Sequence, residues 1–211
     1  MITATNAREY TLRANSPFNF NHQPLELGKS FVQPKLEDFP SLCFKNSPLP
    51  YVREHTTPYV QKVLDAIPLT RQRRYLAVDI KVHDVEPGRY TCIPGWHCDT
   101  VINPYHQTPG EIHHIFVSGG AALTEFIGEP VSLEILEGLS GPSLLQALQK
   151  QLKDLQFSVQ KVPSCQIVTY GRWDFHRASL GLYPEKRLLI RVSETDVIRP
   201  SVQKLQCQNY R

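Results

Sequence analysis

The sequence predicts a mainly β protein with flanking helices, in which the strands form a jelly roll or a related cupin-like, double-sheet barrel. The first indication is the count of 17 prolines against 11 glycines, with many prolines between short apolar runs, which is typical of a turn-rich β domain. The second is a series of about eight strand candidates after residue 75, joined by short turns. The third is that a helix interrupts this series only once.

The chain of 211 residues, 41% of them hydrophobic, is long enough to bury a sizeable core. We expect a single domain over residues 1–211, with the barrel core over residues 75–193. Residues 1–50 have little periodicity, and no Gly/Ser linker separates them from the rest. We predict an extended N-terminal arm packed on the barrel, because its phenylalanines would be costly to leave in water: Phe18, Phe20, Phe31, Phe39 and Phe44.

The first helix is predicted over residues 57–67. Thr57 can cap its N-terminus, and Pro58 suits the first helical position. Apolar residues with helical spacing form one stripe, made of Tyr59, Val60, Val63, Leu64 and Ile67. Pro68 ends the pattern.

From Tyr75 the apolar period changes to two, which predicts a half-buried strand over residues 75–85. A turn follows at residues 86–88, where the sequence is EPG. Further short strands are predicted for residues 113–119, 122–128 and 130–136.

A second helix is predicted over residues 141–155, where leucines gather on one helical face: Leu144, Leu145, Leu148, Leu152 and Leu155. It stands between strand candidates, so we expect it to be an insertion in the barrel. Short strands follow, at residues 157–163, 165–171, 173–179 and 187–194.

Composition excludes several classes of function. The net charge of +3 and the absence of a long Lys/Arg run argue against nucleic-acid binding. No stretch approaches the ~20 apolar residues that span a bilayer. The five cysteines, odd in number and scattered, fit neither a disulfide framework nor a zinc site: Cys43, Cys92, Cys98, Cys165 and Cys207. With no N-terminal apolar signal region, we expect a cytoplasmic protein that contacts no membrane.

The stretch GWHCDT, residues 95–100, places His97 and Asp99 two residues apart. In an extended segment, residues i and i+2 point to the same face, so both side chains can aim into a barrel while Cys98 points away. An imidazole and a carboxylate make up two thirds of the two-histidine, one-carboxylate triad that holds iron(II). The third ligand must come from a distant strand, and His176 in the stretch TYGRWDFHRAS is the best placed candidate.

The last strand candidate puts an arginine beside this triad. Alternate residues on one of its faces are Arg187, Leu189, Arg191 and Ser193. An inward arginine implies an anionic ligand, because a guanidinium pairs with a carboxylate through two parallel hydrogen bonds. Either arginine could provide this contact.

Several nearby residues have alternative roles. Asp174 lies two residues before His176 and could replace Asp99 as the carboxylate ligand. His113 and His114 are adjacent and face opposite sides of a strand, so they cannot both bind one metal, and we expect structural roles for both. Three residues could either border the pocket or serve in packing or an outward position: Trp96, Glu125 and Trp173. His83 has no supporting neighbours in the sequence.

These residues, in this order, resemble a known family. HCD, then about eighty residues to HRAS, then an arginine eleven residues after His176, is similar to the His-X-Asp…His…Arg motif of the Fe(II)/2-oxoglutarate-dependent oxygenases. The resemblance covers residues 75–193 and implies that the barrel is a double-stranded β-helix. The predicted arm lies outside it.

The resemblance implies specific roles. His97, Asp99 and His176 would be the iron ligands. Arg187 would bind the distal carboxylate of 2-oxoglutarate, with Arg191 as its rival, since Arg191 and Ser193 form an Arg-X-Ser variant of the same anchor. Candidates for a further hydrogen bond to the co-substrate are Tyr90 and Thr91.

The expected function is therefore a non-heme iron, 2-oxoglutarate-dependent oxygenase, with Fe(II), 2-oxoglutarate and O2 as cofactor and co-substrates and hydroxylation as the default outcome. A small-molecule or peptide substrate fits this expectation, and neither its identity nor the oligomeric state is predicted. Two alternatives stay open: a cupin-like metalloprotein that does not use 2-oxoglutarate, and a metal-free jelly-roll binding or structural protein.

Overall fold

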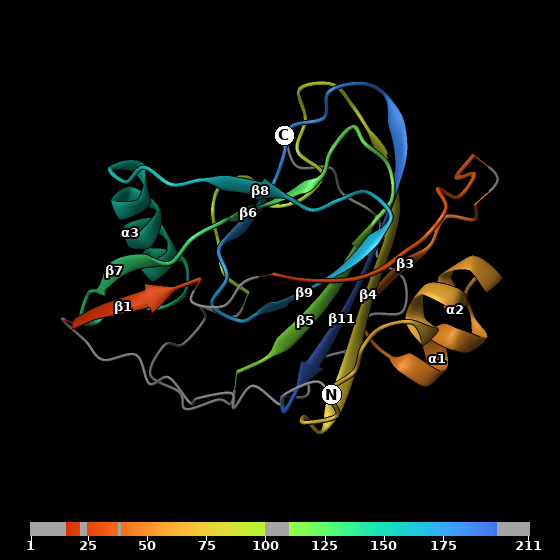
Figure 1. The fold of residues 1–211 in the computed structure, drawn as a ribbon, viewed down its shortest axis with the longest axis horizontal. Coiled ribbons are helices and arrows are strands. Elements are labelled where there is room, and N and C mark those ends of the chain that lie inside the picture. Colours follow the sequence, from red (N-terminus) through yellow and green to blue (C-terminus); the bar gives the residue numbers. More distant parts are fainter. Residues whose placement is uncertain (1–15, 22–24, 38, 100–109, 198–211) are drawn as a thin grey trace.

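The computed structural model describes residues 16–21, 25–37, 39–99 and 110–197, and over these the protein is mainly β with antiparallel strand pairing (Figure 1). The largest sheet has six strands in the order β2 (Glu26–Ser30), β9 (Gln166–Gly171), β5 (Ile112–Val117), β11 (Glu185–Thr195), β4 (Tyr75–Val85) and β3 (Cys43–Pro48). A second sheet has the order β10 (His176–Ala178), β6 (Thr124–Ile127), β8 (Val159–Lys161), and a third pairs β1 (Ser16–Phe20) with β7 (Val131–Ile135). The prediction of a mainly β protein is confirmed.

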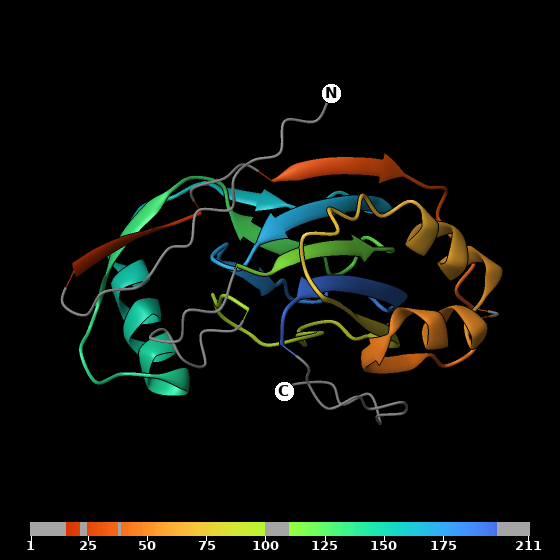
Figure 2. The same ribbon diagram turned by 90° about the horizontal axis from the view of Figure 1, so that it is seen from below.

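Two helices, α1 (Leu49–Glu54) and α2 (Pro58–Asp65), lie beside the six-stranded sheet (Figure 2). They share a hydrophobic core with alternate residues of the central strands, namely Val78, Ile80 and Val82 of β4 and Leu188, Ile190 and Val192 of β11. The predicted cap of α2 is confirmed, since the Thr57 hydroxyl accepts a hydrogen bond from the backbone N–H of Val60 at 3.3 Å. Helix α1 was not predicted, because its sequence is too short for a helical period to show.

The strand predicted at residues 75–85 is confirmed as β4, in which Val78, Ile80 and Val82 are buried and alternate with partly exposed residues. In β4, the alternate residues Asp79, Lys81 and His83 share the other face. Asp79 and Lys81 line an internal cavity, and His83 is only 6% exposed. The polar face of β4 therefore borders the cavity.

The N-terminal segment contributes more than an arm lying on a barrel. β2 and β3 form the two edges of the six-stranded sheet, and β1 pairs with β7. Phe18 and Phe20 of β1 are buried in a separate core with Leu144 and Leu148 of α3 (Gly141–Lys153). Residues 1–15 of the predicted arm, and Cys207, lie outside the described residues.

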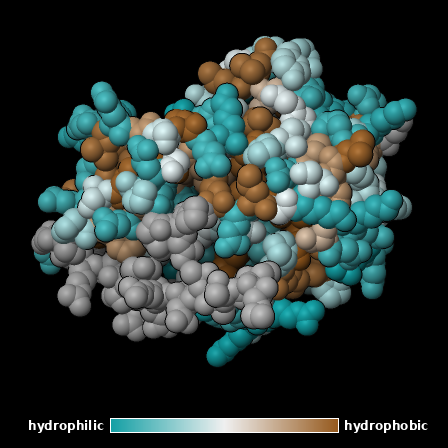
Figure 3. Space-filling view, viewed as in Figure 1, coloured by the Kyte–Doolittle hydropathy of each residue, from teal (hydrophilic) through white to brown (hydrophobic). Residues whose placement is uncertain are grey.

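The later elements were predicted with differences at their ends. Helix α3 buries Leu144, Leu148 and Leu152, but ends at Lys153, so Leu155 is exposed. The strand expected at residues 173–179 is shortened to β10. No helix in the described part of the chain is long and apolar enough to cross a bilayer. On the face shown in Figure 3, hydrophobic residues lie among hydrophilic ones.

Candidate metal centre

His97, Asp99 and His176 come together, with one potential ligand atom of each lying within 4.8 Å of the others. The backbones of His97 and His176 form an isolated antiparallel bridge, in which each N–H donates to the other's carbonyl at 2.9 Å. This bridge brings the two imidazole rings to a centroid separation of 4.4 Å. His176 Nε2 lies 3.7 Å from Asp99 Oδ2.

The backbone also orients both imidazoles. His97 Nδ1 lies 3.0 Å from the carbonyl oxygen of Gly95, and His176 Nδ1 lies 3.0 Å from that of Asp174. A carbonyl only accepts, so each Nδ1 must carry the proton, which leaves the Nε2 lone pair for a metal. Such a bond from the non-ligating nitrogen is typical of metal-binding histidines.

The protonation states suit a cation site. Burial lowers the pKa of His176 to about 4, an effect that Asp99 opposes and His97 reinforces, so its imidazole is neutral at pH 7. Burial alone would raise the pKa of Asp99, but Arg191 and nearby histidines hold it well below its usual range. The site thus offers a neutral imidazole and an ionised carboxylate, the forms that bind a divalent metal.

The carboxylate of Asp99 has two fixed partners. Arg191 Nη1 lies 2.9 Å from Oδ1 and 2.9 Å from Oδ2, and the hydroxyl of Tyr170 donates to Oδ2 at 2.9 Å. The other side of the same guanidinium contacts Asp79. Arg191 is therefore already paired with two carboxylates.

A cavity of about 700 Å³ opens beside the triad and is bordered by both the six-stranded and the three-stranded sheet. Its walls combine the triad with residues such as Thr91, Thr124, Arg187 and Leu189. A cavity of this size is typical of small-molecule sites. It is large enough for a small co-substrate together with part of a second molecule.

Arg187 lines this cavity and lacks a full set of partners. It is 2% exposed, and its Nη2 lies 3.4 Å from Thr124 Oγ1, while Nε and Nη1 have no hydrogen-bond partner among the described residues. Burial lowers its pKa to about 10, so the group stays charged at pH 7. A buried charge without partners is costly, which makes this position suited to an anionic ligand.

His83 adds a second unpaired group beside Arg187, which it faces across the β4–β11 ladder. Neither ring nitrogen has a hydrogen-bond partner in the described structure, and burial, reinforced by the Arg187 charge, lowers the pKa of His83 to about 2. The hydroxyl of Thr91, in the cavity wall, is likewise unpaired among the described residues. The Thr91 hydroxyl can offer a hydrogen bond to an anion held by Arg187, whereas His83 does not line the cavity.

Other predicted site residues lie elsewhere. Tyr90 forms a backbone bridge to Leu180, and the Ser193 hydroxyl lies 2.8 Å from His113 Nδ1; neither Tyr90 nor Ser193 lines the cavity. Asp174 is not part of the triad, because its Oδ2 accepts from the N–H of Gly171 at 2.6 Å.

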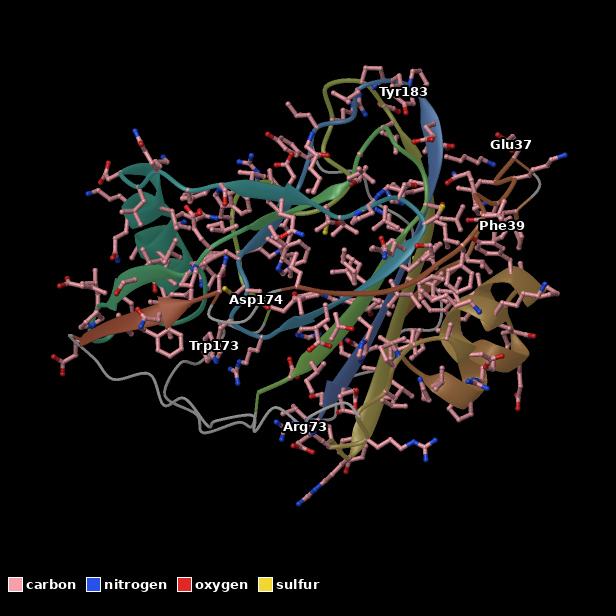
Figure 4. The ribbon with its side chains drawn as sticks, viewed as in Figure 1. Glu37, Phe39, Arg73, Trp173, Asp174 and Tyr183 are labelled. Atoms are coloured by element: carbon pink, nitrogen blue, oxygen red, sulfur yellow. The ribbon has the colours of Figure 1, made fainter. Side chains whose placement is uncertain are left out.

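The tryptophans and Glu125 are also engaged away from the triad. Trp173 packs on Phe18 at a centroid separation of 5.2 Å, close to β1 in Figure 4. Trp96 lies under the Arg177 guanidinium at 4.3 Å, and Glu125 accepts a hydrogen bond from the same arginine. These residues serve packing and ion pairing.

The adjacent histidines of β5 face opposite sides, as predicted. His114 contacts the buried Glu194 at 3.0 Å, which is a structural pair. His113 faces the triad, with its Nε2 3.9 Å from Asp99 Oδ2.

Sequence reasoning missed the positions of Asp79 and Tyr170 in the site. A signal was present, since Asp79, Lys81 and His83 are alternate residues of one strand, and Arg187 and Arg191 are alternate residues of another. Matching the two sets required the register between β4 and β11, which the sequence did not show.

No protein-family model matches the chain, and no match is found among curated proteins or among solved structures. The geometry of the site therefore carries the functional argument alone.

Proposed function

We propose that the protein binds Fe(II) through His97, Asp99 and His176 and acts as a 2-oxoglutarate-dependent oxygenase, with hydroxylation as its default reaction. The observation that carries this proposal is the convergence of two imidazoles and one carboxylate, from segments nearly eighty residues apart, within 4.8 Å. This donor set binds a metal on one side and leaves other positions open for ligands.

We also propose that the barrel is a double-stranded β-helix. The six-stranded and three-stranded sheets both border the cavity. The bridge between His97 and His176 joins the segment that carries His97 to the three-stranded sheet. Both sheets are antiparallel, as the proposed fold requires.

Arg187 is the proposed anchor for the distal carboxylate of 2-oxoglutarate. The edge of its guanidinium formed by Nη1 and Nη2 can make two parallel bonds to a carboxylate, since Nη1 has no partner among the described residues and Nη2 has a long contact of 3.4 Å to Thr124. The hydroxyls of Thr91 and Thr124 lie in the same cavity. Arg191 is less suited, because Asp79 and Asp99 already neutralise it.

Bound iron would supply the redox chemistry that activates oxygen. The chain itself orients both imidazoles through backbone carbonyls, keeps Asp99 ionised, and places a buried cation to hold the co-substrate. The remaining cavity volume is available to a small molecule or a side chain of a peptide.

The first test is thermal unfolding with Mn(II), or with Fe(II) under anaerobic conditions. At a metal concentration a hundredfold above Kd, we expect Tm to rise by about 5–10 °C, because the ligand binds only the folded protein. His176→Ala should abolish this rise, while His55→Ala, which removes an exposed histidine at the C-terminal cap of α1, should keep it. A full metal-induced rise in His176→Ala would contradict the proposed centre.

The second test adds 2-oxoglutarate to the metal-loaded protein. We expect a further rise in Tm and, with Fe(II) in the absence of oxygen, a weak visible charge-transfer band. Arg187→Met should keep the metal-induced rise and lose both signals from 2-oxoglutarate. Arg53→Met, on an exposed ion pair with Asp65, is the matched control and should behave as wild type.

A cupin-like metalloprotein that does not use 2-oxoglutarate is the second candidate. It is favoured by His113, whose Nε2 lies 3.9 Å from Asp99 Oδ2 and could supply a fourth ligand after a small shift. This candidate would be supported if His113→Ala weakened metal binding and the wild-type protein showed no response to 2-oxoglutarate. A protein that binds no metal at all would instead be a binding or structural protein.

A further inference from the structure

We propose that Arg191, anchored by Asp79, is a positioning residue that holds the metal-binding carboxylate of Asp99. Tyr170 supports the same carboxylate from a second side. This inference rests on the proposed metal centre and assigns to Arg191 a role other than binding of the co-substrate.

The guanidinium of Arg191 bridges two carboxylates. Nη1 contacts both oxygens of Asp99 at 2.9 Å, and Nε and Nη2 contact Asp79 Oδ2 at 3.0 and 2.6 Å. A guanidinium offers five N–H donors in a rigid plane, so fixing one edge on Asp79 sets the direction in which Nη1 points. The position of Asp99 then follows from that of Arg191.

Asp79 is itself held by the sheet. It lies directly opposite Arg191 in the β4–β11 ladder, and its Oδ1 accepts a hydrogen bond from the backbone N–H of Asn46 at 2.8 Å. Asn46 has a φ of 49° and lies where the register between β3 and β4 shifts. This irregularity directs a backbone donor at a side chain, as bulges near functional sites commonly do.

Tyr170, on the neighbouring β9, donates its hydroxyl proton to Asp99 Oδ2 at 2.9 Å. Its ring also lies 5.2 Å from that of His176, between centroids, so it contacts two members of the triad.

Asp99 needs such support because it lies outside the named strands. His97 is held by its bridge to His176, whereas Asp99 follows it in a turn. Side-chain contacts to β11 and β9 therefore supply an orientation that a strand ladder would otherwise give. They also spread the charge of Asp99, since Asp79, Arg191 and Asp99 together carry one negative charge.

The test is metal affinity, measured by titrating Co(II) into the metal-free protein and following its visible absorption, which depends on coordination geometry. Removing a residue that orients a ligand typically costs about 10–100-fold in metal affinity. We expect that loss for Arg191→Gln, together with an altered Co(II) spectrum. Arg191→Lys should recover part of the affinity, because the ammonium can still contact Asp99.

Tyr170→Phe removes one hydroxyl and keeps the ring. It therefore tests whether side-chain contacts support the Asp99 carboxylate even if Arg191→Gln does not fold. We expect a smaller loss of Co(II) affinity in the same direction. The matched control is Arg73→Gln, which breaks another partly buried Arg–Asp pair, with Asp196, near the start of β4 (Figure 4). It should lower stability without changing Co(II) affinity.

Three results would overturn the inference. Wild-type affinity and spectrum in both Arg191→Gln and Tyr170→Phe would show that Asp99 needs no support. An equal loss of Co(II) affinity in Arg73→Gln would show that the effect of Arg191→Gln comes from general destabilisation of the fold. Unchanged Co(II) binding with loss of the 2-oxoglutarate response in Arg191→Gln would make Arg191 the co-substrate anchor. A wild-type protein that binds no Co(II) would instead refute the metal centre itself.

Discussion

At the scale of single residues, two carboxylates that each lie two residues from a triad histidine in the chain differ in their surroundings. Asp99 faces a guanidinium, which holds its pKa well below the usual range despite burial. Asp174 is also buried and accepts the N–H of Gly171, and burial raises its pKa to about 6. The difference explains why Asp99 and not Asp174 is suited to bind a cation at neutral pH.

This contrast predicts the pH dependence of stability. A carboxyl whose pKa rises from 3.8 to about 6 on folding binds its proton more tightly in the folded protein. The contribution of this carboxyl to the free energy of unfolding is fully present below pH 3.8 and is lost as pH rises through about 6. Asp174→Asn should therefore gain stability over wild type at pH 7, by up to about 3 kcal/mol, and little at pH 4.

Urea denaturation of both proteins at the two pH values measures this difference. Asp84→Asn, at an exposed position near the end of β4, serves as the control and should change little. An equal effect of Asp174→Asn at pH 4 and pH 7 would contradict the assignment.

At the scale of elements, Asn21 joins the end of β1 to the strands around the site. Its side-chain amide donates to the carbonyl of Ile127 at 2.8 Å, and its Oδ1 accepts from the N–H of Phe175 at 2.7 Å. Its φ of 52° lies in the left-handed region, which asparagine tolerates better than most residues. The residue thus ties β1 to β6 and to the segment that leads into His176.

Replacing Asn21 by alanine leaves a buried carbonyl and a buried N–H without partners and puts alanine at an unfavourable φ. We expect a loss of about 2–4 kcal/mol in the free energy of unfolding. Asn19→Ala, at an exposed position of the same strand, should stay within about 0.5 kcal/mol of wild type. Chemical denaturation compares the two, and equal effects would argue against the role of Asn21.

At the scale of the whole molecule, helices α1 and α2 pack on one face of the six-stranded sheet (Figures 1 and 2). The cavity is lined by residues of the opposite face, among them Asp79, Lys81 and Arg187. A separate core joins β1, β7 and α3 and includes Trp173 and Phe175, which precede His176 in the chain. The first strands of the chain, β1, β2 and β3, therefore belong to the same sheets and cores as the later strands.

Phe20 tests this integration, because its side chain is fully buried in the core of β1, β7 and α3. Phe20→Ala should cost about 3–5 kcal/mol, as expected for a core phenylalanine and not for one on a loosely attached arm. Val32→Ala, at a position 85% exposed, is the control and should have little effect. A loss below about 1 kcal/mol for Phe20→Ala would show that the first strand is dispensable for stability.

Local patterns in the sequence were sufficient for much of the fold. Period-two alternation located β4 and β11, and Thr57 with Pro58 located the start of α2, because these signals depend only on neighbouring residues. The short strands β1, β2 and β3 were not separated from an irregular segment. Their stability comes from pairing with distant strands, which leaves little local signal.

The sequence by itself determined which side chains could form the centre, since the order and spacing of His97, Asp99 and His176 nominated them. Only the tertiary structure decided which arginine is free. Arg191 lies opposite Asp79 in the β4–β11 ladder and is neutralised, whereas Arg187 lies opposite an uncharged His83 and keeps unpaired donors. Strand register sets these pairings between residues more than a hundred positions apart, and alternation within one strand carries no information about it.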